Sequence, residues 1–187
     1  MKIGAVILAG GKSRRMNYNN KSFLSFDGET FIEKIIHVLE RRFDDIIIIA
    51  NDESSYLKYK KEVYKDIYVG KGPMAGIHSA LKNSKNDYVF VVATDMPFVS
   101  EKALELILGN IENHEIVVPM SAGKLHPLCG VYSKNILPKI EKSLEAENYK
   151  LIDFLLTCNT FVVNGDEIKE SFRNINTPED YKKMEMD

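Results

Sequence analysis

Ile3-Gly-Ala-Val-Ile-Leu-Ala-Gly-Gly-Lys-Ser-Arg-Arg-Met-Asn-Tyr-Asn-Asn-Lys21 joins an apolar segment to a loop rich in glycine and positive charge. The apolar part is typical of a buried strand and predicts one over residues 2–9. Gly10 and Gly11 lack a Cβ, so backbone N–H groups there can approach phosphate oxygens closely. Lys12, Arg14, Arg15 and Lys21 follow as the cations. The stretch predicts a polyphosphate-binding loop, with a plain strand-to-helix turn as the alternative.

The spacing of this loop excludes two common phosphate-binding motifs. A Walker A sequence that ends in Gly11-Lys12-Ser13 would need glycine at position 6, which is Val6. The dinucleotide-binding pattern G-x-G-x-x-G has no match here. The pattern is instead L-A-G-G-x-S-x-R-M, followed by Lys21.

Short apolar runs alternate with amphipathic helical patterns along the rest of the chain, which is typical of a mostly parallel sheet with crossover helices. Besides 2–9, the runs predict strands over 46–50, 88–93 and 115–120 and helices near 30–43, 74–81, 100–111 and after 177. Thr30 and Glu33 have the spacing of a capping box. The segment 52–64 is predicted to be partly helical and exposed. We therefore expect a single three-layer, Rossmann-like α/β domain over residues 1–187.

Length and composition agree with such a domain. The 187 residues are enough for one substantial core, and the net charge of −2 gives no general attraction to nucleic acid or to an anionic membrane. Met1-Lys2 leads directly into strand-like sequence and no apolar run reaches eighteen residues, so we expect a cytoplasmic protein. Cys129 and Cys158 form no C-x-x-C pair and are interpreted as reduced thiols. The lysines and tyrosines of 56–65 alternate with acids, which favours a solvated helix face over a nucleic-acid site.

Ligands of such sheets gather at the carboxyl ends of the strands, here after Ala9, Ala50, Ala93 and Met120. Asp95 directly follows one buried strand. One or two carboxylates are sufficient for Mg²⁺ when substrate phosphates and water complete its coordination. Asp95 is therefore the predicted metal ligand, and a turn-capping role is the alternative.

Two further polar residues are candidates for nucleoside binding. Asn51 follows the strand that ends at Ala50, and its amide can both donate and accept. Asp66 precedes a glycine-dense segment, and a carboxylate can accept hydrogen bonds from both N1–H and the exocyclic amine of guanine, a pair that other bases do not offer. A solvated turn is the alternative for Asp66.

In order, the motifs resemble the nucleotidyltransferases of the nucleotide-diphospho-sugar transferase fold, and most closely the molybdenum cofactor guanylyltransferases. The likeness runs from Leu8 to Tyr181. Its parts are the signature loop, Ala50-Asn51, Asp66 with Gly72-Pro-Met-Ala-Gly76, Asp95-Met-Pro97, His126-Pro-Leu-Cys-Gly-Val-Tyr132 and Asn174-Ile-Asn-Thr-Pro178. The first and third parts are shared with cytidylyl- and sugar-nucleotide transferases, whereas the last two are more selective.

The resemblance implies roles for single residues. GTP would contact Asn51, Asp66, Asp95, Lys21 and the loop residues Leu8, Ala9, Gly10 and Gly11. Mg²⁺ would bind Asp95, and Lys21 and Arg15 would complete the catalytic set. The molybdopterin-type acceptor would lie near Gly76, His126, Asn174 and Asn176. Transient contacts with proteins that deliver or receive the cofactor are compatible with this function.

The chain departs from the family pattern at Asn17, where glycine is common, and at Asn20, where an acid is common. Asparagine tolerates a left-handed backbone, so Asn17 can keep the turn. The expected reaction is attack of an acceptor phosphate on the α-phosphorus of GTP with release of pyrophosphate. Two alternatives remain at this point: a nucleotidyltransferase that uses CTP or UTP on a sugar or alcohol phosphate, and a non-catalytic GTP-binding protein.

Overall fold

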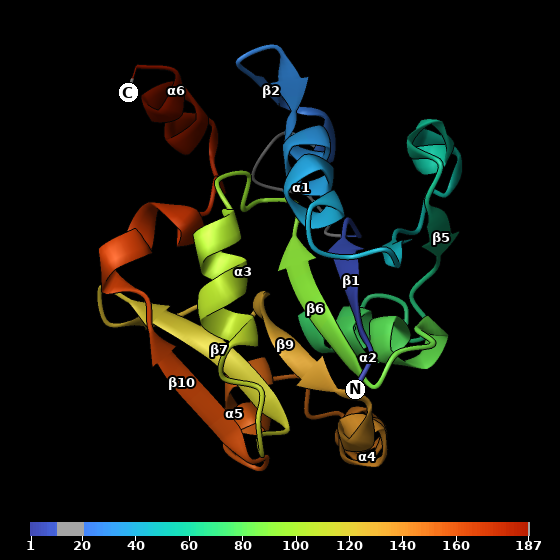
Figure 1. Ribbon diagram of the computed structural model, residues 1–187. Coiled ribbons are helices and arrows are strands. Elements are labelled where there is room, and N and C mark those ends of the chain that lie inside the picture. Colours follow the sequence, from blue (N-terminus) through green and yellow to red (C-terminus); the bar gives the residue numbers. More distant parts are fainter. Residues whose placement is uncertain (11–20, 187) are drawn as a thin grey trace.

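The computed structural model describes residues 1–10 and 21–186 and contains one large, mixed sheet (Figure 1). Its strand order is β10-β7-β9-β6-β1-β4-β5, with β8 paired to β7. The strands are β1 (Ile3–Leu8), β4 (Ile46–Ile49), β5 (Glu62–Tyr64), β6 (Tyr88–Ala93), β7 (Ile116–Ser121), β8 (Lys124–Leu125), β9 (Cys129–Ser133) and β10 (Thr160–Asn164). A hairpin of β2 (Ser25–Phe26) and β3 (Glu29–Thr30) is separate.

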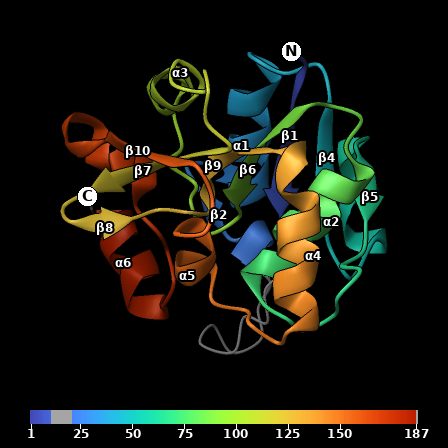
Figure 2. The same ribbon diagram turned by 90° about the horizontal axis from the view of Figure 1, so that it is seen from below.

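Helices cover both faces of the sheet (Figures 1 and 2). One face packs against α1 (Phe31–Glu40) and α3 (Glu101–Leu108), and the other against α2 (Pro73–Asn83), α4 (Leu137–Glu145) and α5 (Leu151–Leu155). Because both faces are covered, β4 is four consecutive buried isoleucines and β6 is almost entirely buried. The predicted three-layer α/β fold is confirmed.

Local signals explain where the helices begin. The backbone N–H of Thr30 donates to Glu33 (2.8 Å), which confirms the capping box of α1. The Ser100 hydroxyl accepts from the Ala103 N–H at the start of α3. The last helix is α6 (Pro178–Met186), with proline at its first position.

The segment 52–64 is partly helical, as predicted, but is not exposed throughout. It forms a short 3₁₀ helix, η3 (Ser54–Tyr59), and then edge strand β5. Tyr56 is 1% exposed, so the expectation of an exposed segment is wrong at this residue. The alternating charges around Tyr56 are typical of an exposed segment, but its hydroxyl lies 2.9 Å from the Ser22 hydroxyl and donates to the Ala9 carbonyl oxygen.

β9 and β10 are among the strands that the sequence patterns did not predict. β9 is antiparallel to both β6 and β7, and β10 pairs in parallel with β7 at the edge of the sheet. The other short 3₁₀ helices in the described part of the chain are η2 (Lys21–Phe23), η4 (Lys134–Ile136) and η5 (Asp166–Phe172). Within the described residues, no helix is both long and apolar enough to cross a membrane.

Pairing of three central strands determines where ligands can bind. Leu8, the last residue of β1, pairs with Ile49 of β4 and with Ala93 of β6. All three strands run in the same direction, so the residues that follow them emerge at one edge. Gly10, Asn51 and Asp95 therefore lie at the same edge of the sheet, as the sequence predicts.

Candidate active site

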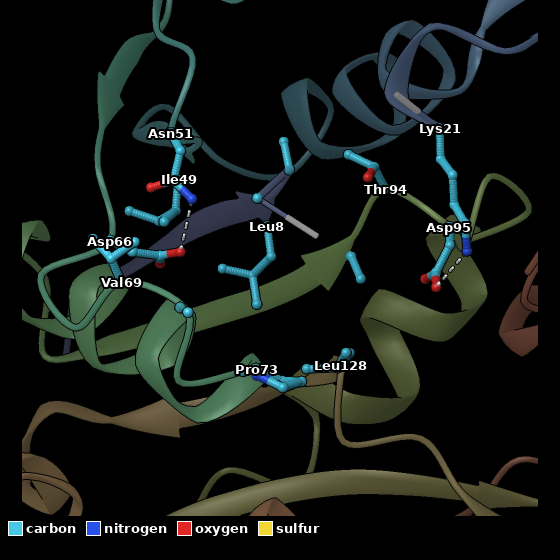
Figure 3. Close-up of a pocket in the computed structure, with 16 residues that line it drawn as sticks. Leu8, Lys21, Ile49, Asn51, Asp66, Val69, Pro73, Thr94, Asp95 and Leu128 are labelled. Atoms are coloured by element: carbon cyan, nitrogen blue, oxygen red, sulfur yellow. Dashed lines mark hydrogen bonds and ion pairs between the residues drawn. The ribbon is translucent and has the colours of Figure 1, made fainter. Parts of the chain in front are cut away.

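A cavity of about 440 Å³ opens at this edge (Figure 3). Its floor is the ends of β1, β4 and β6, and its wall is the loop before α2 together with the start of that helix. The lining residues are Leu8, Ala9, Gly10, Lys21, Ile49, Asn51, Asp66, Val69, Gly70, Gly72, Pro73, Gly76, Ala93, Thr94, Asp95 and Leu128. Polar groups stand at two ends, and apolar residues lie between them (Figure 3).

At one end Asn51 and Asp66 face each other (Figure 3). The Nδ2 of Asn51 donates to Oδ2 of Asp66 over a long 3.4 Å. The other oxygen, Oδ1, is buried and has no hydrogen-bond partner among the residues that the structure describes. Burial raises the pKa of the Asp66 carboxyl, and the hydrogen bond from Asn51 only partly opposes that rise. A carboxylate with an unused buried oxygen is a strong acceptor for a ligand that carries N–H groups.

Gly10 passes close to this carboxylate. A Cβ atom at Gly10 would lie 3.3 Å from Oδ2 of Asp66 and 3.7 Å from Nδ2 of Asn51. A side chain there would fill the space in front of the carboxylate. Glycine therefore keeps the space in front of the Asp66 carboxylate open.

At the other end Lys21 and Asp95 form a partly buried pair (Figure 3). The Nζ of Lys21 lies 3.8 Å from Oδ2 of Asp95 and donates to Oδ1 of Asn176 at 2.9 Å. The Nδ2 of Asn174 donates to Oδ1 of Asp95 at 3.1 Å. Burial raises the pKa of the Asp95 carboxyl, while Lys21 and then Asn174 act against that rise.

The Tyr56 hydroxyl contacts residues that precede and follow the signature loop. Its hydroxyl is 2.9 Å from the Ser22 hydroxyl and donates to the carbonyl oxygen of Ala9 at 3.4 Å. Ser22 is fully buried and directly follows Lys21. The side chain therefore connects the end of the first strand to the short helix that carries the lysine.

Most of the predicted site residues that the structure describes lie in or beside the cavity. Asn174 contacts Asp95, and Asn176 contacts Lys21. The predicted residues that line the cavity are Leu8, Ala9, Gly10, Lys21, Asn51, Asp66, Gly76 and Asp95. Gly11 and Arg15 lie outside the described residues, as do Asn17 and Asn20.

His126 lies apart from the cavity lining. The ring is buried and its Nε2 is 2.8 Å from the Ser121 hydroxyl. It also stacks on Phe172, with 5.4 Å between ring centroids. Burial lowers the pKa of His126, and the charge of Lys124 lowers it further. Its predicted contact with the acceptor stays a prediction.

The sequence patterns missed the apolar lining. Val69, Pro73 and Leu128 line the cavity between its charged ends. Gly70 and Gly72 have φ angles of +76° and +77°, which let the loop turn beside Val69. The dense glycines before α2 were the signal of this turn, but no pattern indicates which side chains it presents.

Comparison with known proteins agrees with this geometry. A family model described as "MobA-like NTP transferase domain" matches residues 5–158, which include both β1 and Asp95. The chain belongs to this family. A probable molybdenum cofactor guanylyltransferase from Clostridium perfringens is 45% identical, over 98% of this chain and 96% of the relative. The molybdenum cofactor guanylyltransferase of Desulfosudis oleivorans is 34% identical, over 98% and 94% respectively.

Solved structures support the same assignment of this MobA-like protein. The molybdopterin-guanine dinucleotide biosynthesis protein A of Archaeoglobus fulgidus superposes with a TM-score of 0.82 at 27% identity, covering 98% of this chain and 97% of that one. A cytidylyltransferase from Thermus thermophilus superposes with a TM-score of 0.75 at 16% identity, over 100% and 98%, which shows the shared fold alone. The protein is a nucleotidyltransferase by family.

The residues present are compatible with Mg²⁺ that arrives with a nucleotide. Among the described parts of the chain, no group of three or more His, Cys, Asp or Glu residues is arranged to enclose a metal. The partly buried Asp95 offers one hard carboxylate beside the cavity. Mg²⁺ commonly takes one or two carboxylates and completes its octahedron with phosphate oxygens and water.

Proposed function

We propose that this MobA-like protein transfers a guanylyl group from GTP to the terminal phosphate of molybdopterin that carries molybdenum. The observation that supports this most is Asp66, which lines the cavity at the end away from Lys21 and Asp95 and whose Oδ1 is buried without a hydrogen-bond partner among the described residues. A carboxylate in that position can accept both N1–H and the exocyclic amine of guanine. The relatives named as guanylyltransferases support the same substrate.

Under this proposal the guanine base and the triphosphate bind at opposite ends of the cavity. Guanine lies against Asn51 and Asp66, with the apolar residues beside its ring. The triphosphate extends along Gly10 toward Lys21. Asp95 holds Mg²⁺, which supplies positive charge to the triphosphate oxygens when it is bound.

The transfer requires positioning and charge neutralisation more than proton transfer. An oxygen of the acceptor phosphate forms a bond to the α-phosphorus, and the bond from that phosphorus to the pyrophosphate oxygen breaks. The acceptor phosphate is already anionic near neutral pH, so no residue has to remove a proton. Lys21 stabilises the charge that accumulates between the two anions, and the loop aligns them.

Calorimetry with GTP, ATP, CTP and UTP, each with and without Mg²⁺, tests the proposal. We expect a preference for GTP that Asp66→Ala abolishes and a Mg²⁺ dependence that Asp95→Ala abolishes. Pyrophosphate release on addition of molybdopterin completes the test. A preference for a pyrimidine nucleotide would instead favour transfer to a sugar or alcohol phosphate, and GTP binding without pyrophosphate release would favour a non-catalytic role.

A further inference from the structure

Lys21 and Asp95 are opposite charges in a partly buried site that approach each other without a direct hydrogen bond. Their side chains are 15% and 21% exposed, yet Nζ and Oδ2 are 3.8 Å apart. A direct charge-assisted hydrogen bond between such groups is about 2.7–2.9 Å long. Lys21 and Asp95 therefore form an ion pair without a direct hydrogen bond between Nζ and Oδ2.

The tripeptide Asn174-Ile175-Asn176 contacts both members of this pair. Asn176 accepts a hydrogen bond from Nζ of Lys21 at 2.9 Å, so its neutral amide is nearer to the lysine than the Asp95 carboxylate is. Asn174 donates to Oδ1 of Asp95 at 3.1 Å. Between them, the backbone N–H of Ile175 donates to the Asp95 carbonyl at 2.8 Å.

The backbone of this tripeptide is anchored from two directions. Ile175 is fully buried and packs in a small core with Phe31 and Met184. At the start of α6, the backbone N–H groups of Asn176 and Thr177 both donate to Asp180, at 2.9 Å each. The two asparagine side chains therefore extend from a fixed backbone.

We infer that Asn174 and Asn176 are positioning residues that keep Lys21 and Asp95 apart and available to Mg²⁺ and the triphosphate. This inference rests on the proposed function and deepens it. The family model ends at residue 158, so the tripeptide Asn174-Ile175-Asn176 lies beyond the matched residues.

The physical reason lies in the competition between charges. Without the amide of Asn176, the ammonium group of Lys21 can close onto Asp95. A closed pair would neutralise the lysine that the phosphates need and cover the carboxylate that the metal needs. A neutral amide holds the lysine without adding a charge, whereas a carboxylate in its place would compete with the phosphates for it. The sequence-based role of Asn176, contact with the acceptor, predicts none of these effects on GTP.

A double-mutant cycle between Lys21 and Asn176 tests the inference, with Mg²⁺ and GTP alone in the calorimeter. We expect Asn176→Ala to weaken binding of Mg-GTP by about tenfold, within the roughly hundredfold that misplacement of a site residue can cost. On the Lys21→Ala background, the same change should alter affinity by less than about twofold, because its effect passes through the lysine. Asn176→Asp, which retains the shape and an acceptor oxygen, should weaken binding more than Asn176→Ala does.

The role of Asn174 beside Asp95 is tested by the Mg²⁺ dependence of GTP binding. Asn174→Ala should raise the Mg²⁺ concentration needed for half of the metal-dependent gain in GTP affinity several-fold. The control is Asn135→Ala. Asn135 is exposed and lies in η4, just after Ser133, which pairs with Tyr88 at the start of β6, whereas the cavity lies at the other end of that strand. Asn135→Ala should leave both measurements unchanged, and thermal unfolding should show all variants to be folded at the assay temperature.

Two results would overturn the inference. One is an equal loss from Asn176→Ala with and without Lys21; the other is unchanged GTP affinity together with a raised KM for molybdopterin, which would return Asn176 to the acceptor site. The calorimetric cycle needs no acceptor and can use whichever nucleoside triphosphate the wild type binds. Failure of the wild type to release pyrophosphate with molybdopterin would therefore refute the proposed function alone.

Discussion

The substitution Asp66→Asn separates recognition of the nucleotide from stability of the fold, because the two should change in opposite directions. The carboxylate accepts two N–H groups of guanine under the proposed function. An asparagine of the same shape can accept only one, and its amide N–H₂ then opposes the second donor. The protein without a ligand, in contrast, no longer has to bury a carboxylate oxygen that lacks a partner.

The magnitude follows from these contacts. Each charge-assisted hydrogen bond contributes roughly 1.5–3 kcal/mol, and one neutral bond of about 1 kcal/mol remains in the variant. The net loss of about 2–4 kcal/mol corresponds to roughly 30- to 1000-fold weaker GTP binding, while ATP binding should be nearly unchanged. The free energy of unfolding should rise by about 1 kcal/mol, since the desolvation of the charge is removed.

Calorimetry with GTP and ATP, and chemical denaturation without ligand, measure the two effects. Asp44→Asn is the matched control, because Asp44 is exposed and lies just before β4, at the strand's other end from Asn51. Its affinities should equal those of the wild type. A parallel loss of GTP and ATP affinity, or a fall in the stability of Asp66→Asn, would refute the reasoning.

Four further outcomes are expected. On acidification, GTP affinity should begin to fall at a higher pH than an ordinary aspartate would give, because the pKa of Asp66 is raised. Asp66→Asn should remove this pH dependence of binding. The ionised carboxyl lowers the free energy of unfolding, and this penalty should be relieved as the pH falls below the raised pKa of Asp66. Lys21→Ala should lower the rate of pyrophosphate release by about tenfold to a thousandfold, and wild-type turnover would contradict its role. Tyr56→Phe should lower the free energy of unfolding by about 1 kcal/mol in denaturant titrations, because the buried Ser22 hydroxyl loses the Tyr56 hydroxyl that lies 2.9 Å from it. Gly130→Ala should lower it by about 1–3 kcal/mol, because a Cβ there would lie 2.7 Å from the Val117 carbonyl oxygen; unchanged denaturation would contradict this packing.

Much of the central fold was predictable because its signals are local. The four isoleucines of β4 and the apolar run of β6 indicate strands that are buried on both faces. Once these strands are parallel, the residues after them must share one edge, which explains why Gly10, Asn51 and Asp95 could be placed together. The outer part of the sheet was not predictable in this way. β9 runs antiparallel to its neighbours, and β10 pairs with a strand 44 positions earlier in the sequence, with Val162 opposite Val118 and loops and helices between the two strands.

Recognition of the site from the sequence worked best where one residue type suits one chemistry. Asp66 and Asp95 are predictable as site residues because carboxylates suit guanine and Mg²⁺, and both line the cavity. The charges around Tyr56 follow a surface pattern and predict an exposed face, whereas its hydroxyl is buried between Ala9 and Ser22. Nothing in local spacing reports such a contact.

The sequence alone determined the phosphate-binding character of the signature loop, the α/β class and the family, because glycine spacing, hydrophobic periodicity and motif order are properties of neighbouring residues. Only the tertiary structure decided how Lys21 and Asp95 are arranged. They are 74 positions apart, and the amides that keep them at 3.8 Å come from Asn174 and Asn176 near the other end of the chain. A distance between side chains from three separated segments depends on how the whole core packs, and no local pattern encodes it.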